Sequence, residues 1–436
     1  MKTTQLTHLY MYKKLASALL LFVMLAMVPA EALAVRRYST GMEWQSVTSG
    51  VEWTTTVSTP TISTTIKNGG SASISFSTAT AVKSLQHTVA SLGVYYLRYY
   101  VYVVPGAGTG ANITVGLKNA SNIYAGHLTI TEGATPTLSV RANSTSTPIT
   151  NTASLTNGNW HMIEMFANSA DGAGLDDLTV RVDGTEVANA NNLNLITNSV
   201  TLDVSAINTS GSGDVFYVDD IGLNDTTGSA QTSWPGAGKI VTAVPNATGF
   251  TACTIGVFSS INEVPPSETS TGSTDRCEMT TNGGQTATFN VTDTSTLGID
   301  SYDTINLVYT MMRLKELSSN VTVWQPLISA NGSATSSGSA VDAGDLTNRT
   351  NPNGTAAFGN TLISYTNPST AVAWTPTGTN SIDSMKIGVT GTDFNPDVYV
   401  QTMAAMVEYR DVYVPVSATS LMLGKLTFMN GKLILI

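Results

Sequence analysis

Apolar and polar side chains alternate with a period of two through much of this chain of 436 residues. The clearest case is the segment 93–104, in which every second side chain from Tyr95 to Val103 is apolar or aromatic. Such alternation predicts a β-strand with these residues on its core face. The opposite face is then expected to carry Tyr96, Arg98, Tyr100 and Tyr102.

Further short strands are predicted wherever β-branched or alternating runs are bounded by turn residues. In the first half of the chain they are 51–57, 61–66, 71–76, 113–117, 123–130, 137–141, 160–166, 178–182, 185–188, 200–204 and 215–220. In the second half they are 286–291, 301–313, 321–328, 360–366, 371–375, 384–389 and 398–409. No segment shows helical periodicity over three turns. The predicted fold class is therefore all-β, with two antiparallel β-sandwich (jelly-roll) domains in tandem.

Turn-forming residues predict two hairpins. Asp183-Gly184 supplies the positive φ that a two-residue turn needs, and Asn430-Gly431 does the same near the C-terminus. We expect the C-terminal hairpin, within 412–436, to pack on its own domain. The alternative is self-assembly, in which the hairpin contacts a second copy of the chain.

A shift to Gly, Ser, Thr and Pro around Trp234-Pro235-Gly236 predicts a linker over 229–249. The expected domains are then a jelly roll over 35–228 and a second sandwich over 250–411.

The N-terminus reads as a secretory signal over residues 1–34. Lys13 and Lys14 precede an apolar run from 15 to 28, and Ala32-Leu33-Ala34 fits a cleavage site after Ala34. An uncleaved membrane anchor is the alternative, but this run is shorter than the roughly 20 apolar residues that a span needs. We therefore expect a secreted protein, extracellular or at the cell surface, with no membrane span after cleavage.

Charge is scarce, at 11% of residues, and the formal net charge is −10. Without a cluster of cations, the chain is not expected to bind nucleic acid or an anionic membrane. Cys253 and Cys277 are the two cysteines, and in a secreted chain they favour one disulfide. A metal site or a reactive thiol is the alternative, but no histidine or second cysteine pair lies near them at ligand spacing.

Three motifs carry a family resemblance: Asn159-Trp160-His161, Val180 to Thr185, and Tyr217-Val218-Asp219-Asp220-Ile221. Together they resemble the second half of a concanavalin A-like (laminin-G-like) jelly roll, over roughly 41–225. The later Asn224-Asp225 and Trp234-Pro235-Gly236 are most similar to lectin-like domains of phage and environmental extracellular proteins. This resemblance implies carbohydrate binding or adhesion, although the same fold also hosts glycan hydrolases.

The hydrolases of this superfamily carry an E-x-D-x-x-E strand, which places two glutamates as nucleophile and acid. This chain has no Glu-x-Asp, and its paired acids, Asp176-Asp177 and Asp219-Asp220, are adjacent, so on strands they would point to opposite faces. The histidines of the mature chain, His87, His127 and His161, are isolated from one another. We therefore expect no enzymatic activity. The alternative is a polysaccharide-active enzyme, a glycoside hydrolase, with a non-standard site.

Two sets of residues are candidate sites. The first is the row of Tyr96, Arg98, Tyr100 and Tyr102, which could stack on and hydrogen-bond a glycan, or could instead pack against other parts of the protein. The second is a possible calcium site, for which turn stabilisation is the alternative, at Asp219, Asp220, Asn224 and Asp225. The predicted function is a secreted, non-enzymatic surface or structural protein that serves glycan binding, adhesion or extracellular assembly.

Overall fold

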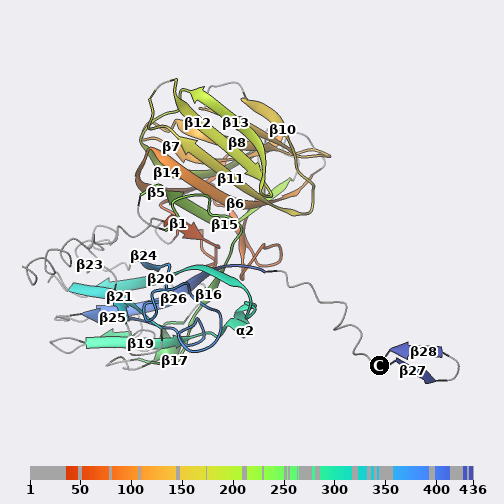
Figure 1. Cartoon of the computed structure of the whole chain (residues 1–436). Coiled ribbons are helices and arrows are strands. Elements are labelled where there is room, and N and C mark those ends of the chain that lie inside the picture. Colours follow the sequence, from red (N-terminus) through yellow and green to blue (C-terminus); the bar gives the residue numbers. More distant parts are fainter. Residues whose placement is uncertain are drawn as a thin grey trace, which may run out of the picture. The chain divides into compact units, whose positions relative to one another are not determined.

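A computed structural model of the chain divides it into two compact units (Figure 1). The structure describes residues 36–47, 52–77, 81–106, 110–143, 148–172, 174–208, 214–227, 230–249, 253, 256–262, 264, 277–279, 285–316, 323–330, 335–337, 341–342, 357–391, 398–412, 426–429 and 432–435. The predicted signal at 1–34 lies outside the described residues.

The division of the chain differs from the predicted domains. Unit 1 comprises residues 1–39 and 76–236, and unit 2 comprises 40–75 and 237–436. The segment 40–75, expected in the first domain, therefore belongs to unit 2. Trp44 explains this placement, because it is fully buried in a cluster with Tyr309, Met311 and Met406 of unit 2, and its Nε1 donates to Met311 Sδ at 2.8 Å.

The predicted linker 229–249 is also corrected. Within it, β16 (Lys239–Ala243) and β17 (Pro245–Thr248) are strands of unit 2. The buried Ile240 and Ala243 hold β16 in place. The Gly- and Pro-rich composition marks the chain only up to about Gly236, and the apolar pattern after it is that of a strand.

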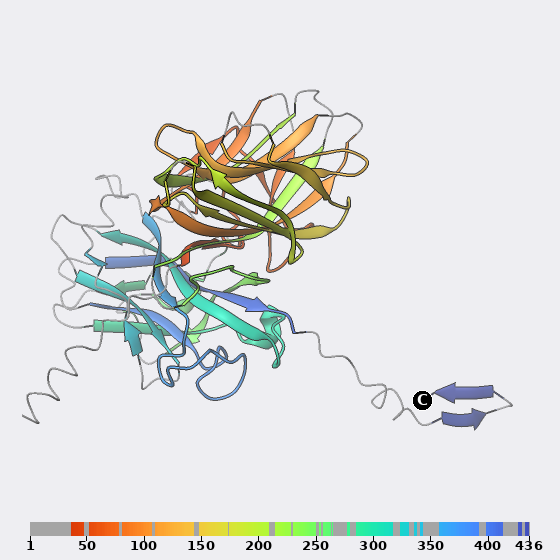
Figure 2. The ribbon, with the colours of Figure 1, turned by 45° about the horizontal axis from the view of Figure 1, so that its top comes forward.

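Unit 1 has two antiparallel sheets, the arrangement that the resemblance to jelly rolls implies; Figure 2 gives a second view. Within unit 1, the strands of the first sheet follow one another as β13-β12-β11-β6-β15, with β1 paired to β15. Its strands are β1 (Arg36–Thr40), β6 (Val94–Val104), β11 (Trp160–Asn168), β12 (Asp176–Val182), β13 (Thr185–Leu193) and β15 (Val215–Asp225).

Within unit 1, the strands of the second sheet follow one another as β10-β9-β8-β7-β14-β5. Its strands are β5 (Lys83–Leu92), β7 (Ala111–Lys118), β8 (Tyr124–Thr131), β9 (Thr137–Arg141), β10 (Thr150–Ser154) and β14 (Ser199–Asn208). The inward side chains of both sheets form the core. On β6 these include Tyr95, Leu97 and Tyr99, all fully buried, which confirms the alternation predicted for this strand.

The predicted Asp183-Gly184 hairpin is present between β12 and β13. Asp183 has a φ of 50° and Gly184 a φ of 79°, which are the two positive values that such a turn requires.

Unit 2 is also all-β. Its sheets have the orders β16-β26-β20-β24, with β18 on β26, and β17-β19-β25-β21-β22, with β23 on β21. The strands are β18 (Cys277–Met279), β19 (Gln285–Val291), β20 (Thr304–Glu316), β21 (Val323–Ser329), β22 (Thr335–Ser337), β23 (Val341–Asp342), β24 (Ala357–Ser364), β25 (Lys386–Gly391) and β26 (Val398–Arg410). Between β1 and β5 the chain forms β2 (Thr55–Val57), β3 (Thr61–Ser63) and β4 (Ser73–Ser77).

Helices are short where the structure describes them: η1 (Phe258–Ser260) and α2 (Thr294–Leu297). No helix in these ranges is long and apolar enough to cross a membrane. The predicted strand 371–375 is wrong. It contains only an isolated bridge from Thr366 to Ala373, in a loop in which the Asn367 carboxamide oxygen accepts from the backbone N–H of Ser369 at 2.8 Å.

The two cysteines form the predicted disulfide, Cys253 to Cys277, with their Cα atoms 5.3 Å apart. At the C-terminus, β27 (Leu426–Met429) pairs with β28 (Lys432–Leu435) as the predicted hairpin. Nothing in the described residues supports self-assembly through this hairpin.

The disulfide gives a test of stability. The double variant Cys253→Ser/Cys277→Ser should lower the free energy of unfolding of unit 2 by roughly 3 kcal/mol, because the bond closes a loop across a separation of 24 residues. Urea titration followed by near-ultraviolet circular dichroism measures the loss. Adding a reductant should shift the wild-type midpoint and leave that of the double variant in place; a shift in both would contradict the prediction.

Candidate functional site

The outer face of the first sheet of unit 1 carries the tyrosine row predicted to bind glycans. The structure separates its members. Arg98 is fully buried, whereas Tyr96, Tyr100 and Tyr102 are half-buried. The guanidinium of Arg98 donates to the backbone oxygens of Asp220 and Gly236, each at 3.1 Å. Arg98 is therefore held by the protein backbone and is not a ligand-binding donor, contrary to the expectation from the sequence.

A glycine and a β-bulge make room for this arginine. In the pairing of β15 with β6, the register shifts between Asp219 and Gly222, and Asp220 has a φ of 48°. A Cβ on Gly222 would lie 2.4 Å from Nη1 of Arg36 and 3.3 Å from Nη2 of Arg98. Two buried guanidinium groups thus occupy the space that a side chain at position 222 would fill.

The segment 231–236 crosses the same part of the face. Gly236 N–H donates to Oε1 of Glu164 at 2.9 Å, and Glu164 lies opposite Arg98 in the pairing of β11 with β6. The Asn224 carboxamide donates to the backbone oxygen of Ser233 at 2.8 Å. These contacts fix the segment over the half of the sheet that carries Tyr96.

Trp234 completes this cover. Its ring lies 5.4 Å from that of Tyr96 and 6.3 Å from that of Phe166, and the Arg181 guanidinium lies 4.0 Å from its centroid. Tyr96 therefore packs against the chain's own residues, which is the alternative weighed for the row.

The other half of the face presents a second group of rings. Tyr102 lies 5.5 Å from Trp160 and 5.9 Å from Tyr217, centroid to centroid, and all three residues are half-buried. Tyr100 is one step along β6, with its hydroxyl 3.5 Å from Sδ of Met162. We call Tyr100, Tyr102, Trp160 and Tyr217 the ring platform. The sequence predicted Tyr100 and Tyr102 as neighbours on one face of a strand. Trp160 and Tyr217 lie beside them only because β6 pairs with β11 and β15.

The possible calcium ligands are mostly committed to other partners. The bulge breaks the alternation expected for Asp219 and Asp220, and both are fully buried. The Asp225 carboxylate accepts from Arg37 at 2.6 Å and from the Thr227 hydroxyl at 2.9 Å. Within the described residues, no group of three or more His, Cys, Asp or Glu is placed to hold a metal ion. The calcium site at these residues stays a prediction.

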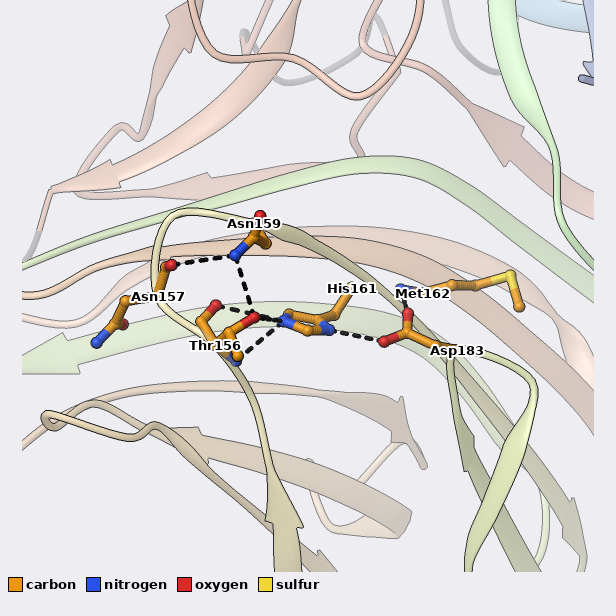
Figure 3. A network of polar contacts seen from close by, with 6 residues as sticks. All are labelled: Thr156, Asn157, Asn159, His161, Met162 and Asp183. Carbon is orange, nitrogen blue, oxygen red and sulfur yellow. Dashed lines mark hydrogen bonds and ion pairs between the residues drawn. The ribbon is translucent and has the colours of Figure 1, made fainter.

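His161 links two turns at the edge of the same sheet (Figure 3). Its Nδ1 lies 2.8 Å from Oδ2 of Asp183, and its Nε2 accepts from the Thr156 backbone N–H at 3.0 Å and lies 2.9 Å from the Thr156 hydroxyl. Asp183 also accepts from the Met162 N–H at 2.9 Å. A hydroxyl, an imidazole and a carboxylate in line suggest a nucleophilic triad. However, the backbone N–H on Nε2 occupies the lone pair that a general base would need, so the network ties the 156–161 turn to the β12–β13 hairpin.

A second cluster, which sequence reasoning missed, lies on the outer face of the other sheet of unit 1. In the pairing of β7 with β8, Gly116 is opposite His127 and Lys118 is opposite Tyr124, so β8 has one extra residue, and Gly126 there has a φ of 84°. This bulge places Tyr124 and His127 on one face with their rings stacked at 4.5 Å. A Cβ on Gly116 would lie 2.8 Å from Cβ of His127, so only glycine leaves room for β8 at this position.

Asp203 is the centre of this cluster. It is fully buried, and its carboxylate accepts from Ser84 at 3.0 Å, Gln86 at 2.8 Å and the Tyr124 hydroxyl at 2.5 Å. Lys118 forms an ion pair with it at 3.0 Å. Burial, and next the nearby charge of Asp203, raise the pKa of Tyr124, which therefore stays protonated as a donor.

His127 is 5% exposed, and its Nδ1 is enclosed with no hydrogen-bond partner among the described residues. Burial, then the charges of Arg141 and Lys118, lower its pKa to about 4. The imidazole is therefore neutral at neutral pH. One signal in the sequence could have found the cluster: Gly126 interrupts the alternation between Tyr124 and His127 in a predicted strand.

Comparisons with known proteins give fold likeness only. No protein-family model matches the chain, and no curated protein matches it in sequence. Among solved structures, it is similar to the endo-β-1,4-glucuronan lyase of the fungus Trichoderma reesei, at 11% identity over 44% of this chain and 96% of that one, with a TM-score of 0.34. It is also similar to the carbohydrate recognition domain of Emp47p, at 14% identity over 44% and 97% of the two chains, with a TM-score of 0.33. A carbohydrate esterase from Shiga toxin-encoding bacteriophage phi24B gives 11% identity, 44% and 100% coverage and a TM-score of 0.34.

Replacing the buried arginine tests its role in holding the fold. Arg98→Met should lower the free energy of unfolding by roughly 3 kcal/mol or more, because two charged hydrogen bonds to buried carbonyl groups are lost. Arg181→Met is the matched control, since it removes only a half-exposed cation from Trp234, worth about 1 kcal/mol. Equal losses in the two variants, measured by urea titration, would contradict the assignment.

The pH dependence of stability tests His127. In the unfolded chain this histidine takes up a proton near pH 6.5, whereas in the folded chain it does so near pH 4. Its contribution to stability is therefore fully present above about pH 6.5 and is lost as the pH falls toward 4. Between these values His127→Gln should lose roughly 2 to 3 kcal/mol less stability than the wild type. Parallel stability curves for the two proteins would exclude the enclosed neutral state.

Proposed function

We propose that unit 1 is a carbohydrate-binding module that holds neutral sugar rings on the ring platform of Tyr100, Tyr102, Trp160 and Tyr217. The observation that carries the proposal is the grouping of Trp160 and Tyr217 around Tyr102, all three half-buried, on an outer sheet face. Aromatic rings of this kind offer an apolar face to the C–H groups of a sugar, and the hydroxyl and indole N–H groups offer polar contacts beside it.

The position of the platform on paired strands supports the proposal. Its residues come from β6, β11 and β15, with Trp160 opposite Tyr102 and Tyr102 opposite Tyr217. The backbone hydrogen bonds of three adjacent strands therefore fix the spacing of the rings. A ligand that stacks on them meets a surface already formed, so little ordering free energy opposes binding.

We further propose that the protein acts outside the cell, in adhesion or surface attachment, and that the module is not an enzyme. The disulfide supports an oxidising compartment, because such bonds persist there. On this face the carboxylate of Glu164 accepts the Gly236 N–H and is 2% exposed, so it is not presented to a ligand as an acid or base. A polysaccharide-active enzyme is the alternative that the experiment must separate.

Glycan-array binding of the full chain tests the module. Tyr102→Ala and Trp160→Ala should each weaken binding to a captured neutral glycan roughly fivefold to tenfold, since one stacked ring contributes about 1 kcal/mol beyond its buried area. Tyr302→Ala removes an exposed tyrosine of unit 2 (50% exposed) and should leave the affinity unchanged.

Two results would count against the proposal. If neither platform variant changed glycan binding, the glycan site would have to lie elsewhere on the protein. Release of reducing sugar from the bound polysaccharide would replace the non-enzymatic module with the enzyme.

A further inference from the structure

We propose that the outer face of the other sheet of unit 1 holds a separate site for an anionic sugar residue, formed by Lys118, Tyr124, His127 and Arg141. The group recognised is a carboxylate or a sulfate on a saccharide. This site is distinct from the ring platform, because its residues come from β7, β8 and β9 and not from the sheet that carries the platform.

The local backbone is shaped for these side chains. The β8 bulge at Gly126 brings Tyr124 and His127 to one face, and Gly116 leaves the space for Cβ of His127. A Cβ on Gly116 would also meet the backbone oxygen of Gly126 at 2.7 Å. Bulges that redirect a side chain are common beside functional sites. An enclosed Nδ1 with no partner among the described residues is a further cost that packing alone does not explain.

The charges favour an anion. Lys118 and Arg141 act on His127 from two strands, β7 and β9, and the Asp203 carboxylate pairs with Lys118 at 3.0 Å. Lys118 and Arg141 thus bring two cationic side chains to this face, on a chain with a net charge of −10. Asp203 is fully buried beneath Ser84, Gln86, Tyr124 and Lys118, so it orients the donors and does not face a ligand.

The surroundings favour a sugar over a bare ion. The Lys118 ammonium lies 4.6 Å from the centroid of the Tyr124 ring, and His127 stacks on the same ring. Beside them, Thr114 and Thr129 share a hydrogen bond at 3.1 Å and are half-buried, as is Ser139 on the next strand. Cations, stacked rings and hydroxyl groups on one sheet face match the acidic group and hydroxyl groups of a charged saccharide.

Isothermal titration of the full chain with three size-matched oligosaccharides tests the site: an oligogalacturonate, a sulfated oligosaccharide and a neutral dextran. We expect one or both anionic ligands to bind, added salt to weaken this binding, and an excess of the neutral dextran, which only the ring platform would take up, to leave it unchanged. Comparison of the two anionic arms identifies carboxylate or sulfate as the recognised group. Competition between dextran and the anionic ligand, or no binding of either anion, would overturn the proposal.

Variants locate the binding on this face. Arg141→Gln should weaken binding of the anionic ligand at least tenfold, whereas Lys83→Gln, which removes a lysine at the start of β5, should change it less than twofold. Tyr102→Ala should also leave it unchanged, which separates this site from the ring platform. If Arg141→Gln unfolds, as judged by circular dichroism, Arg141→Lys takes its place, with at least threefold weakening expected. Unchanged affinity in a folded arginine variant would refute the site.

Discussion

The buried guanidinium of Arg98 is the interaction on which the first sheet of unit 1 depends most directly. A charge with no exposed surface is costly unless its donors meet fixed acceptors. Here the acceptors are backbone oxygens of the β15 bulge and of Gly236, so one side chain on β6 joins the sheet to the segment that crosses it. Gly222 leaves the space that this guanidinium occupies, and the positive φ of Asp220 forms part of the bulge whose backbone oxygen accepts from it.

This constraint also decides which part of the face a ligand can use. Because Arg98 and Glu164 both bind Gly236, the segment 231–236 lies over the Tyr96 half of the sheet, and Trp234 packs there. The Tyr102 half keeps its rings half-buried beside Trp160 and Tyr217. The buried Arg98 and the platform residue Tyr102 thus lie on the same strand, separated by four positions along β6.

Period-two alternation predicted most strands and the fully buried face of β6, and the Asp-Gly dipeptide predicted the turn at 183–184, because each follows from neighbouring residues in the sequence. The fate of Arg98 depends on contacts 122 and 138 residues away, which no local pattern contains. The same holds for Trp44, whose indole donates to Met311 at a separation of 267 residues. The linker predicted from composition was wrong at 239–248, because apolar strand residues directly follow the Gly- and Pro-rich stretch.

Both missed features of unit 1 arise at bulges, where strict alternation no longer assigns faces. At Asp219-Asp220 the bulge buries two carboxylates that alternation would have set on opposite faces. The bulge at Gly126 has the opposite effect. Residues three positions apart on a regular strand lie on opposite faces, but here Tyr124 and His127 lie on the same face. In each case a glycine, Gly222 or Gly116, accommodates the charged or ring side chain of an adjacent strand. Although only 11% of the residues are charged, several charged side chains lie at the bulges of β15 and β8. The outer faces of the two sheets therefore differ in the charged groups that they carry.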